Sequence, residues 1–333
     1  MNNSKKLTLR DIKLAHDRIK DVINRTNLDF SSTFSKIAEN EVFLKPENLQ
    51  KTGSFKARGA LNAVSLLSEK EKRKGAITLS GGNHSQGFAW ACSKLRIKSF
   101  VVMPKCSPKI KVEATKKYGS KIISYGTDTI QLRQKALEIS KNKDLVFIDP
   151  MNDIGIIAGN GTIGLEILED LPNVQAMFIP VSGGSLISGI ATAVKNVNPK
   201  VKIIGVQPTG ASAMYLSLKN NKLSEIPSIK TVADGLTAKK PGEVTFSIVK
   251  ELVDEIVLVT DEEIISSMLL ILERAKLLVE PAGAASLAAV IYKKVGLRNS
   301  KIVTILSGGN VDLSELSAFI MEDYKGIDSF SLG

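Results

Sequence analysis

The chain has 333 residues, 43% of them hydrophobic, and this length suggests about two domains with buried cores. Its 45 lysine and arginine residues exceed its 34 acidic residues, which gives a formal net charge of +11. A positive charge attracts nucleic acids and acidic membranes, but here the lysines are scattered and only 5% of the residues are aromatic. We therefore expect neither a nucleic acid nor a membrane as a partner.

The cysteines and the N-terminal segment indicate the cellular compartment. Cys92 and Cys106 are too few for a disulfide framework and lack the spacing of a metal-binding pair. Residues 1–20 alternate charged and apolar side chains, unlike a signal peptide, and no apolar stretch approaches the roughly 18 residues needed to cross a bilayer. These features predict a cytoplasmic protein without a metal site.

Apolar runs typical of buried β-strands alternate with helical patterns along the chain. The predicted strands lie at residues 42–44, 76–79, 99–103, 121–125, 145–148, 176–179, 203–206, 256–259 and 302–306. Such alternation predicts parallel sheets that are covered by helices on both faces. In this architecture ligands bind at the carboxyl ends of the strands.

Lys56 is the first candidate for chemistry. It lies among small residues in the segment 53–60, directly before a predicted helix at 57–67. A lysine is normally a solvated surface charge, but the first turn of a helix is positive and disfavours the protonated amine. We therefore interpret Lys56 as a nucleophile or base that presents its amine to an aldehyde cofactor.

Three glycine-containing segments, 80–84, 182–186 and 307–309, follow predicted strands. Segment 182–186 also precedes a predicted helix, so its N–H groups suit an anion such as phosphate. A dinucleotide site is an alternative there, although the glycines lack the Gly-x-Gly-x-x-Gly spacing. Each segment taken alone is also typical of an ordinary turn or helix cap, and so is Glu280 before Pro281.

Five segments, in this order, resemble the serine/threonine dehydratases across nearly the whole chain. They are residues 47–60, 80–87, 182–186, 280–285 and 307–312. That family consists of pyridoxal-phosphate (PLP) enzymes of fold type II, the tryptophan-synthase-β-like fold. The resemblance implies two doubly wound α/β domains with mostly parallel sheets. It places a small domain at 75–149 within a large PLP-binding domain formed by 1–74 and 150–333, and it implies a homodimer or homotetramer.

The resemblance also implies a role for each site residue. Lys56 would hold pyridoxal 5'-phosphate as an imine, Asn83 would contact the ring hydroxyl, and Ser307 would contact the pyridine nitrogen. Glu280 would face the ring, and Phe55 would also belong to the cofactor-binding residues. The phosphate would bind to Ser182, Gly183, Gly184, Ser185 and Leu186, and the substrate carboxylate to Ser80, Gly81, Gly82, Asn83 and His84.

The activity implied is that of a lyase, a threonine ammonia-lyase. It eliminates the β-hydroxyl of L-threonine to give 2-oxobutanoate and ammonia, and it converts L-serine to pyruvate. Serine racemases are similar but carry a second base, a serine, at the position of Gly81, and acids of a metal loop at the positions of Gln207 and Ala213. These departures favour elimination over racemisation and make a metal site doubtful.

Several alternatives stay open at this point. One is β-replacement or threonine synthesis on the same cofactor, and another is a basic nucleotide-binding or nucleic-acid-binding α/β protein without catalysis. The preference for threonine over serine is open too. Phe34, Phe55 and Met151 are candidate contacts of the substrate methyl group because they lie near the motifs, but each is more typical of a core residue. A role in isoleucine biosynthesis or in catabolism is equally open. Because the sequence ends at Gly333, we expect no C-terminal regulatory domain, whereas a nucleotide or cation effector stays possible.

Overall fold

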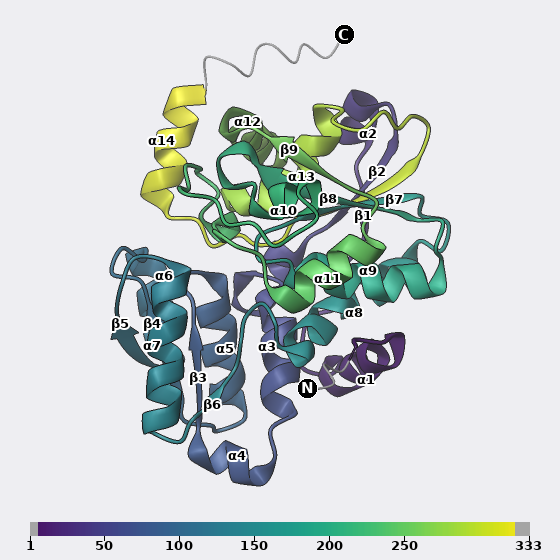
Figure 1. Cartoon of the computed structure of the whole chain (residues 1–333). Helices are drawn as coiled ribbons and strands as arrows, with labels where there is room; N and C mark the ends of the chain where they lie inside the picture. Colours follow the sequence, from purple (N-terminus) through teal and green to yellow (C-terminus); the bar gives the residue numbers. More distant parts are fainter. Residues whose placement is uncertain (1–5, 324–333) are drawn as a thin grey trace.

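The computed structural model describes residues 6–323, which form two β-sheets surrounded by helices (Figure 1). The larger sheet has the strand order β1-β2-β10-β7-β8-β9, and the smaller has the order β5-β4-β3-β6. Within residues 6–323, no helix is long and apolar enough to cross a membrane.

The six-stranded sheet is parallel except at its edge, where β1 runs antiparallel to β2. Its strands are β1 (Asp29–Phe30), β2 (Glu41–Lys45), β10 (Lys301–Ile305), β7 (Ala176–Pro180), β8 (Lys202–Pro208) and β9 (Glu255–Val259). Side chains alternate between the two faces of a strand. Phe178 and Ile204 accordingly pack into one core, and Met177 and Ile203 pack into another. The sheet is therefore buried on both faces.

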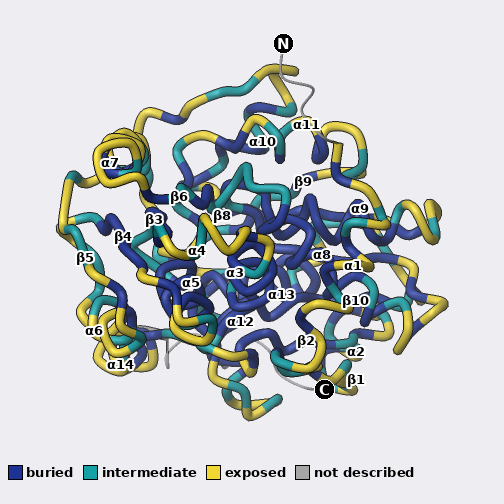
Figure 2. Tube along the Cα trace, turned by 90° about the horizontal axis from the view of Figure 1, so that it is seen from below, coloured by how far each residue is buried: buried dark blue, intermediate teal, exposed yellow. Residues whose placement is uncertain are grey.

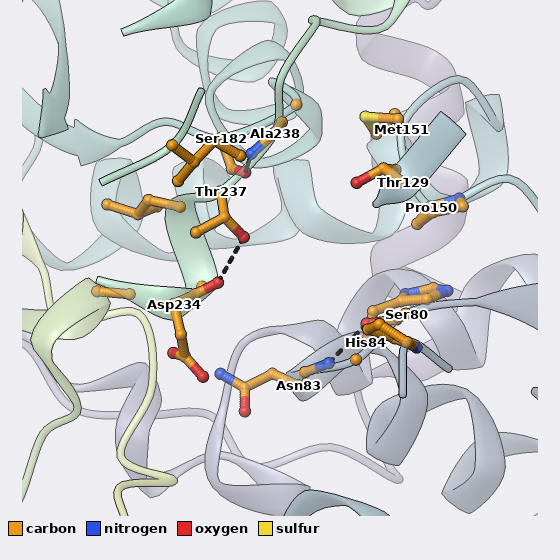
Figure 3. Close-up of a pocket in the computed structure, with 18 of the residues that line it drawn as sticks. Ser80, Asn83, His84, Thr129, Pro150, Met151, Ser182, Asp234, Thr237 and Ala238 are labelled. Carbon is orange, nitrogen blue, oxygen red and sulfur yellow. Dashed lines mark hydrogen bonds between the residues drawn. The ribbon is translucent and has the colours of Figure 1, made fainter. Parts of the chain in front are cut away.

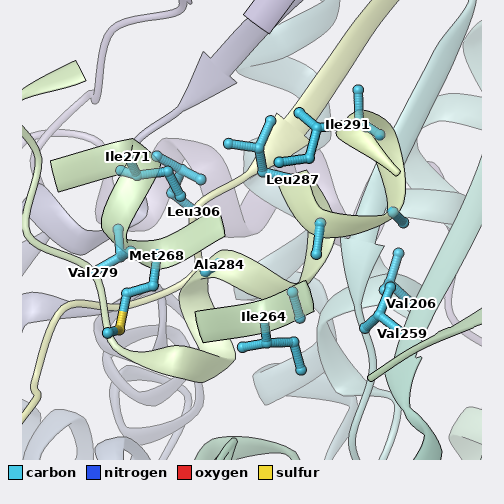
Figure 4. Close-up of a cluster of buried hydrophobic side chains, with 14 of the residues drawn as sticks. Val206, Val259, Ile264, Met268, Ile271, Val279, Ala284, Leu287, Ile291 and Leu306 are labelled. Atoms are coloured by element: carbon cyan, nitrogen blue, oxygen red, sulfur yellow. The ribbon is translucent and has the colours of Figure 1, made fainter. Parts of the chain in front are cut away.

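Helices cover both faces of this sheet. Helices α12 and α13 contribute to the first core, which Figure 4 shows, and α8 and α9 contribute to the second. Every residue of α13 is buried, so it occupies the interior of the molecule (Figure 2). The helices are α1 (Leu9–Ile19), α2 (Ser32–Ala38), α8 (Ile154–Asp170), α9 (Ser185–Val197), α10 (Ala213–Lys219), α11 (Glu243–Leu252), α12 (Asp261–Leu270), α13 (Pro281–Ile291) and α14 (Leu313–Asp323).

The four-stranded sheet is parallel throughout. Its strands are β5 (Lys121–Ser124), β4 (Ser99–Met103), β3 (Ala76–Leu79) and β6 (Val146–Phe147). Helices α3 and α5 pack on one face and α7 packs on the other. The helices of this part are α3 (Lys56–Ser65), α4 (Glu69–Lys74), α5 (Asn83–Lys94), α6 (Lys109–Lys117) and α7 (Thr129–Asn142).

Short helical turns complete the connections. The 3₁₀ turns η1 (Glu47–Leu49) and η2 (Lys51–Gly53) join β2 to α3, η3 (Thr209–Ala211) follows β8, and η4 (Asp234–Leu236) ends a long loop. A π-helical turn, η5 (Ile271–Ala275), extends α12.

The predicted fold class is confirmed, and each predicted strand matches an observed one to within two residues. Only β1 was not predicted among the described strands, because two residues give no alternation to recognise. The division into domains stays a prediction. All strands of the smaller sheet lie between residues 76 and 147, but Ile19, Ile23 and helix α3 also contribute to its core.

A buried charge network, formed by Lys45, Glu47, Arg58 and Glu166, fixes helix α3 between β2 and α8. Arg58 donates from Nε to Glu47 at 2.8 Å and from Nη1 to Glu166 at 2.6 Å. Lys45 Nζ donates to Glu166 at 2.7 Å. All four side chains are almost completely buried, and their charges sum to zero. The network therefore anchors the helix that begins at Lys56.

Removal of one carboxylate from this network should destabilise the fold. In E166Q, Lys45 loses its carboxylate partner while Arg58 keeps Glu47, and loss of one partner from a buried ion pair costs about 3–5 kcal/mol. The free energy of unfolding, measured by urea titration of the cofactor-free protein, should fall by that amount. The matched control is E251Q, which breaks the exposed Lys6–Glu251 pair and should cost no more than about 1 kcal/mol. Equal losses in the two variants would contradict the structural role of the network.

Candidate active site

A cavity of about 680 Å³ lies where the carboxyl ends of strands from both sheets meet. Its walls include the segments that follow β3, β4, β5 and β6 of the smaller sheet and β7 and β10 of the larger one. Every residue that the sequence predicted for the site lines this one cavity. They are Phe55, Lys56, Ser80, Gly81, Gly82, Asn83, His84, Ser182, Gly183, Gly184, Ser185, Leu186, Glu280 and Ser307.

Lys56 is the first residue of α3, and its amine lies over the ring of Phe55, 4.7 Å from the ring centroid. None of the described residues forms an ion pair with it. Burial lowers the pKa of Lys56 to about 8, although the charge of Glu280 acts in the opposite direction. About one amine in ten is then neutral at pH 7, against about one in three thousand at a pKa of 10.5. The site thus holds an amine that is ready to act as a nucleophile.

The backbone of Lys56 is held in place by close packing against α5. A Cβ added at Gly87 would lie 3.0 Å from the carbonyl carbon of Lys56, so only glycine lets the two helices approach this closely. On the other side, the backbone N–H of Phe55 donates to the carbonyl of Ser307 at 3.1 Å. Lys56 is therefore positioned by both sheets.

The loop between β7 and α9 has a backbone that suits an anion. Gly184 is the N-cap of α9 with φ of 100°, a conformation that other residues rarely adopt, and no side chain caps the helix. A Cβ at Gly183 would overlap the side chain of Met151. The first N–H groups of α9 therefore have no side-chain acceptor, which is the arrangement that binds phosphate.

Helix α5 begins in a similar way. Gly82 is its N-cap, Asn83 is its first residue, and no side chain caps it. The N–H of Gly82 donates to Ser80 Oγ at 3.0 Å. A second uncapped helix start on the same cavity offers a place for a second anionic group, such as a carboxylate.

His84 is buried and neutral. Thr78 Oγ1 donates to the carbonyl of Ile148 at 2.7 Å, so it must accept from His84 Nε2 at 3.0 Å. Burial, together with the charge of Lys56, lowers the pKa of His84 to about 3. This assigns the proton to Nε2 and leaves Nδ1 as an acceptor without a partner among the described residues.

Glu280 and Asn83 form a polar pair against the loop after β10. Asn83 Nδ2 donates to Glu280 Oε1, and Asn83 Oδ1 accepts from Asn310 Nδ2 at 3.0 Å. A Cβ at Gly308 would lie 2.5 Å from Glu280 Oε1, so the glycine makes room for the pair. Burial raises the pKa of Glu280 to about 7, although Lys111 opposes the shift.

Ser307 follows β10 and lines the cavity with only a weak internal contact. Its hydroxyl donates to the carbonyl of Ala282 at 3.3 Å, a long distance for an O–H donor. The hydroxyl is thus free to turn toward a ligand atom.

The structure also brings residues to the cavity that the sequence did not single out. They belong to the loops 104–108, 127–129, 227–229 and 234–239. Figure 3 shows Asp234 and Thr237 on one side of the cavity, across from Thr129 and His84. The dipeptide Asp234-Gly235 is a common turn signal that gives no hint of a ligand. Of the three candidate contacts for a substrate methyl group, Phe55 and Met151 line the cavity, whereas Phe34 is a core residue, the more typical role for such a side chain.

These residues fit pyridoxal phosphate. An unpaired amine with a lowered pKa suits an aldehyde, and the uncapped start of α9 suits a phosphate. Asn83 and Ser307 supply polar groups for the ring on the same cavity. Lys56, the 182–186 loop, Asn83 and Ser307 would therefore hold the cofactor.

The chain is similar in sequence to two proteins of named activity. The chain is 44% identical to the L-threonine ammonia-lyase of Thermotoga maritima over 94% of this chain and 78% of that protein. It is 43% identical to the catabolic L-threonine dehydratase TdcB of Escherichia coli K12 over 93% of this chain and 95% of that protein.

Solved structures give the same relationship. A processed threonine deaminase isoform 2 from Solanum lycopersicum has a TM-score of 0.89 with 36% identity, covering 97% of this chain and 92% of that one. The serine racemase of Dictyostelium discoideum has a TM-score of 0.86 with 38% identity, covering 92% of this chain and 99% of that one. The family model of pyridoxal-phosphate dependent enzymes matches residues 19–308. The chain belongs to the family of pyridoxal-phosphate dependent enzymes.

Proposed function

We propose that the protein is a threonine ammonia-lyase that converts L-threonine to 2-oxobutanoate and ammonia, and L-serine to pyruvate and ammonia. The observation that carries the proposal is the unpaired, desolvated amine of Lys56 in a cavity with two uncapped helix starts. The similarity to proteins named L-threonine ammonia-lyase and L-threonine dehydratase supports the same activity.

Each of the two uncapped helices binds a different anionic group. The start of α9, at residues 182–186, binds the phosphate of the cofactor, because its N–H groups and the helix dipole favour negative charge. The start of α5, with Ser80, binds the carboxylate of the substrate in the same way. Two anions held at fixed places orient the amino acid with its α-carbon toward Lys56.

When bound, pyridoxal phosphate supplies an electrophilic aldehyde carbon and a ring that withdraws electrons from the substrate's α-carbon. Lys56 removes the proton from the α-carbon, since its lowered pKa leaves a neutral amine near physiological pH. The β-hydroxyl then departs as water, and the proton that it takes up balances the one that Lys56 removed from the α-carbon. One water is consumed when the released enamine hydrolyses to the 2-oxo acid and ammonia. Ser307, a neutral hydroxyl, does not hold a proton on the ring nitrogen as a carboxylate would, which favours prompt elimination.

Racemisation is the second candidate, because serine racemases are among the similar structures. At the position of their second base this chain has Gly81, and the structure leaves little room there. A Cβ at Gly81 would lie 2.8 Å from Pro104 Cγ and 3.0 Å from Ser107 Oγ. Gln207, at the position of a metal-loop acid, instead accepts from the backbone N–H of Tyr215 at 2.8 Å. The lack of a second base at Gly81 favours elimination, and the contact of Gln207 with Tyr215 argues against a metal site there.

The cytoplasmic location and a homodimeric or homotetrameric assembly stay predictions. Size-exclusion chromatography coupled to light scattering measures the oligomeric state directly. The preference between threonine and serine also stays open, with Phe55 and Met151 as the remaining candidate contacts on the cavity wall.

Replacement of Lys56 by alanine tests the proposed function. We expect the loss of the base alone to lower kcat for L-threonine by about 10²–10⁴-fold. Borohydride reduction of the wild type followed by peptide mass spectrometry should place the cofactor on Lys56, and K56A should carry no covalent cofactor. The control is K51A, which removes a nearby exposed lysine and should keep both attachment and turnover. Full turnover in K56A would reject the proposal.

The absence of a hydroxyl at position 81 predicts the fate of L-serine. The wild type should form pyruvate without matching amounts of D-serine, because a glycine has no proton to deliver to the opposite face of the α-carbon. Chiral chromatography of the reaction mixture, with pyruvate measured in parallel, checks this. D-serine formed as fast as pyruvate would show that another residue acts as the second base.

A further inference from the structure

Lys111 differs from the other lysines of its helix. Helix α6 also carries Lys109, Lys116 and Lys117, and these three are exposed, whereas Lys111 is 2% exposed. A buried lysine must keep its charge paired or lose it. Lys111 therefore has a partner that the sequence did not reveal.

Two carboxylates share this ammonium group. Lys111 Nζ donates to Asp234 Oδ2 at 2.5 Å and to Glu280 Oε2 at 3.4 Å. The Glu280 side chain is 2% exposed, and Asp234 is 44% exposed. Lys111 itself does not line the cavity, but both of its partners do. It therefore acts on the cavity only through them.

The three residues come from separate parts of the fold. Lys111 belongs to α6 beside the smaller sheet, Asp234 opens η4 at the end of a long loop, and Glu280 is the N-cap of α13. The loop that carries Asp234 lines the cavity through residues 234–239. The ammonium group of Lys111 thus connects the Asp234 loop both to helix α6 of the smaller sheet and to Glu280 in the cavity wall.

The contact continues from Glu280 to the predicted cofactor site. Glu280 turns one oxygen to Lys111 and the other to Asn83 Nδ2. A carboxylate only accepts, so while Glu280 is ionised, Asn83 must present its amide nitrogen to Glu280 and its oxygen to Asn310. The ionisation of Glu280 therefore decides which way the Asn83 amide lies.

We propose that Lys111 is a positioning residue that keeps Glu280 ionised, and so fixes the Asn83 amide, while it fastens the Asp234 loop over the cavity. The inference rests on the proposed cofactor site but not on the substrate.

Four charged groups face this carboxylate or its partners. Lys111 from α6 and Lys56 from α3 favour the ionised form of Glu280, and Asp234 from η4 disfavours it. Glu315 from α14 faces Asp234 and Lys111. Burial raises the pKa of Glu280, so loss of Lys111 should raise it further, and loss of the Asp234 charge should lower it. The two substitutions therefore act in opposite directions.

The experiment measures the dissociation constant of pyridoxal phosphate from the cofactor-free protein between pH 5 and 9. The variants are K111M and D234N, and the control is K117M, which removes an exposed lysine of the same helix. Far-UV circular dichroism checks that each variant is folded. Because the ligand is the same in every titration, its own ionisations cancel between variants. Turnover is not needed, so a wild type that binds the cofactor but leaves threonine unchanged would refute the proposed function alone.

We expect K111M to weaken binding at pH 7 by at least about tenfold, as one charge of a buried pair is left alone. The pH below which affinity falls should move up in K111M, move down in D234N and stay unchanged in K117M. If K111M does not fold, the downward shift in D234N tests the proposal by itself. Unchanged pH dependence in both variants, or shifts in the same direction, would overturn it.

Discussion

The chemistry of this protein depends on one partly buried lysine amine that forms no ion pair with any of the described residues. A charged ammonium is costly in such a place, so the equilibrium moves toward the neutral amine, and the pKa of Lys56 falls to about 8. The nearest balancing charge, on Glu280, acts only at a distance and is itself engaged by Asn83 and Lys111. The amine of Lys56 therefore stays reactive because the carboxylate of Glu280 is bound to Asn83 and Lys111 instead.

Two cationic residues of the same helix, Lys56 and Arg58, lie in opposite electrostatic environments. Lys56 and Arg58 are two residues apart on α3, so they point to different sides of the helix. Arg58 enters the buried charge network, where Glu47 and Glu166 neutralise it and its pKa rises. Lys56 enters the cavity, where no carboxylate of residues 6–323 forms an ion pair with it. One side of α3 thus contributes to stability and the other carries the reactive amine. Gly87, which has no side chain, lets α5 pack closely against the start of α3.

Most of the fold and the site was accessible from the sequence because its signals are local. Buried parallel strands give continuous apolar runs, and glycine-containing turns after those runs mark the carboxyl edge of the sheets, as at Ser182 and Ser307. Lys111 was missed because its burial arises from contacts 123 and 169 residues away in the chain. Phe34 on helix α2 is buried in the core, which shows that closeness in sequence to a motif does not bring a side chain to the cavity.

Nuclear magnetic resonance can follow the ionisation of the Lys56 side chain itself. A ¹³C titration of the lysine ε-carbons in the cofactor-free protein, with Lys56 assigned by its absence from K56A, gives the pKa of Lys56. The account predicts a midpoint of about 8, well below that of the exposed lysines. A midpoint near 10.5 would show that the amine is solvated or paired, and would contradict the account.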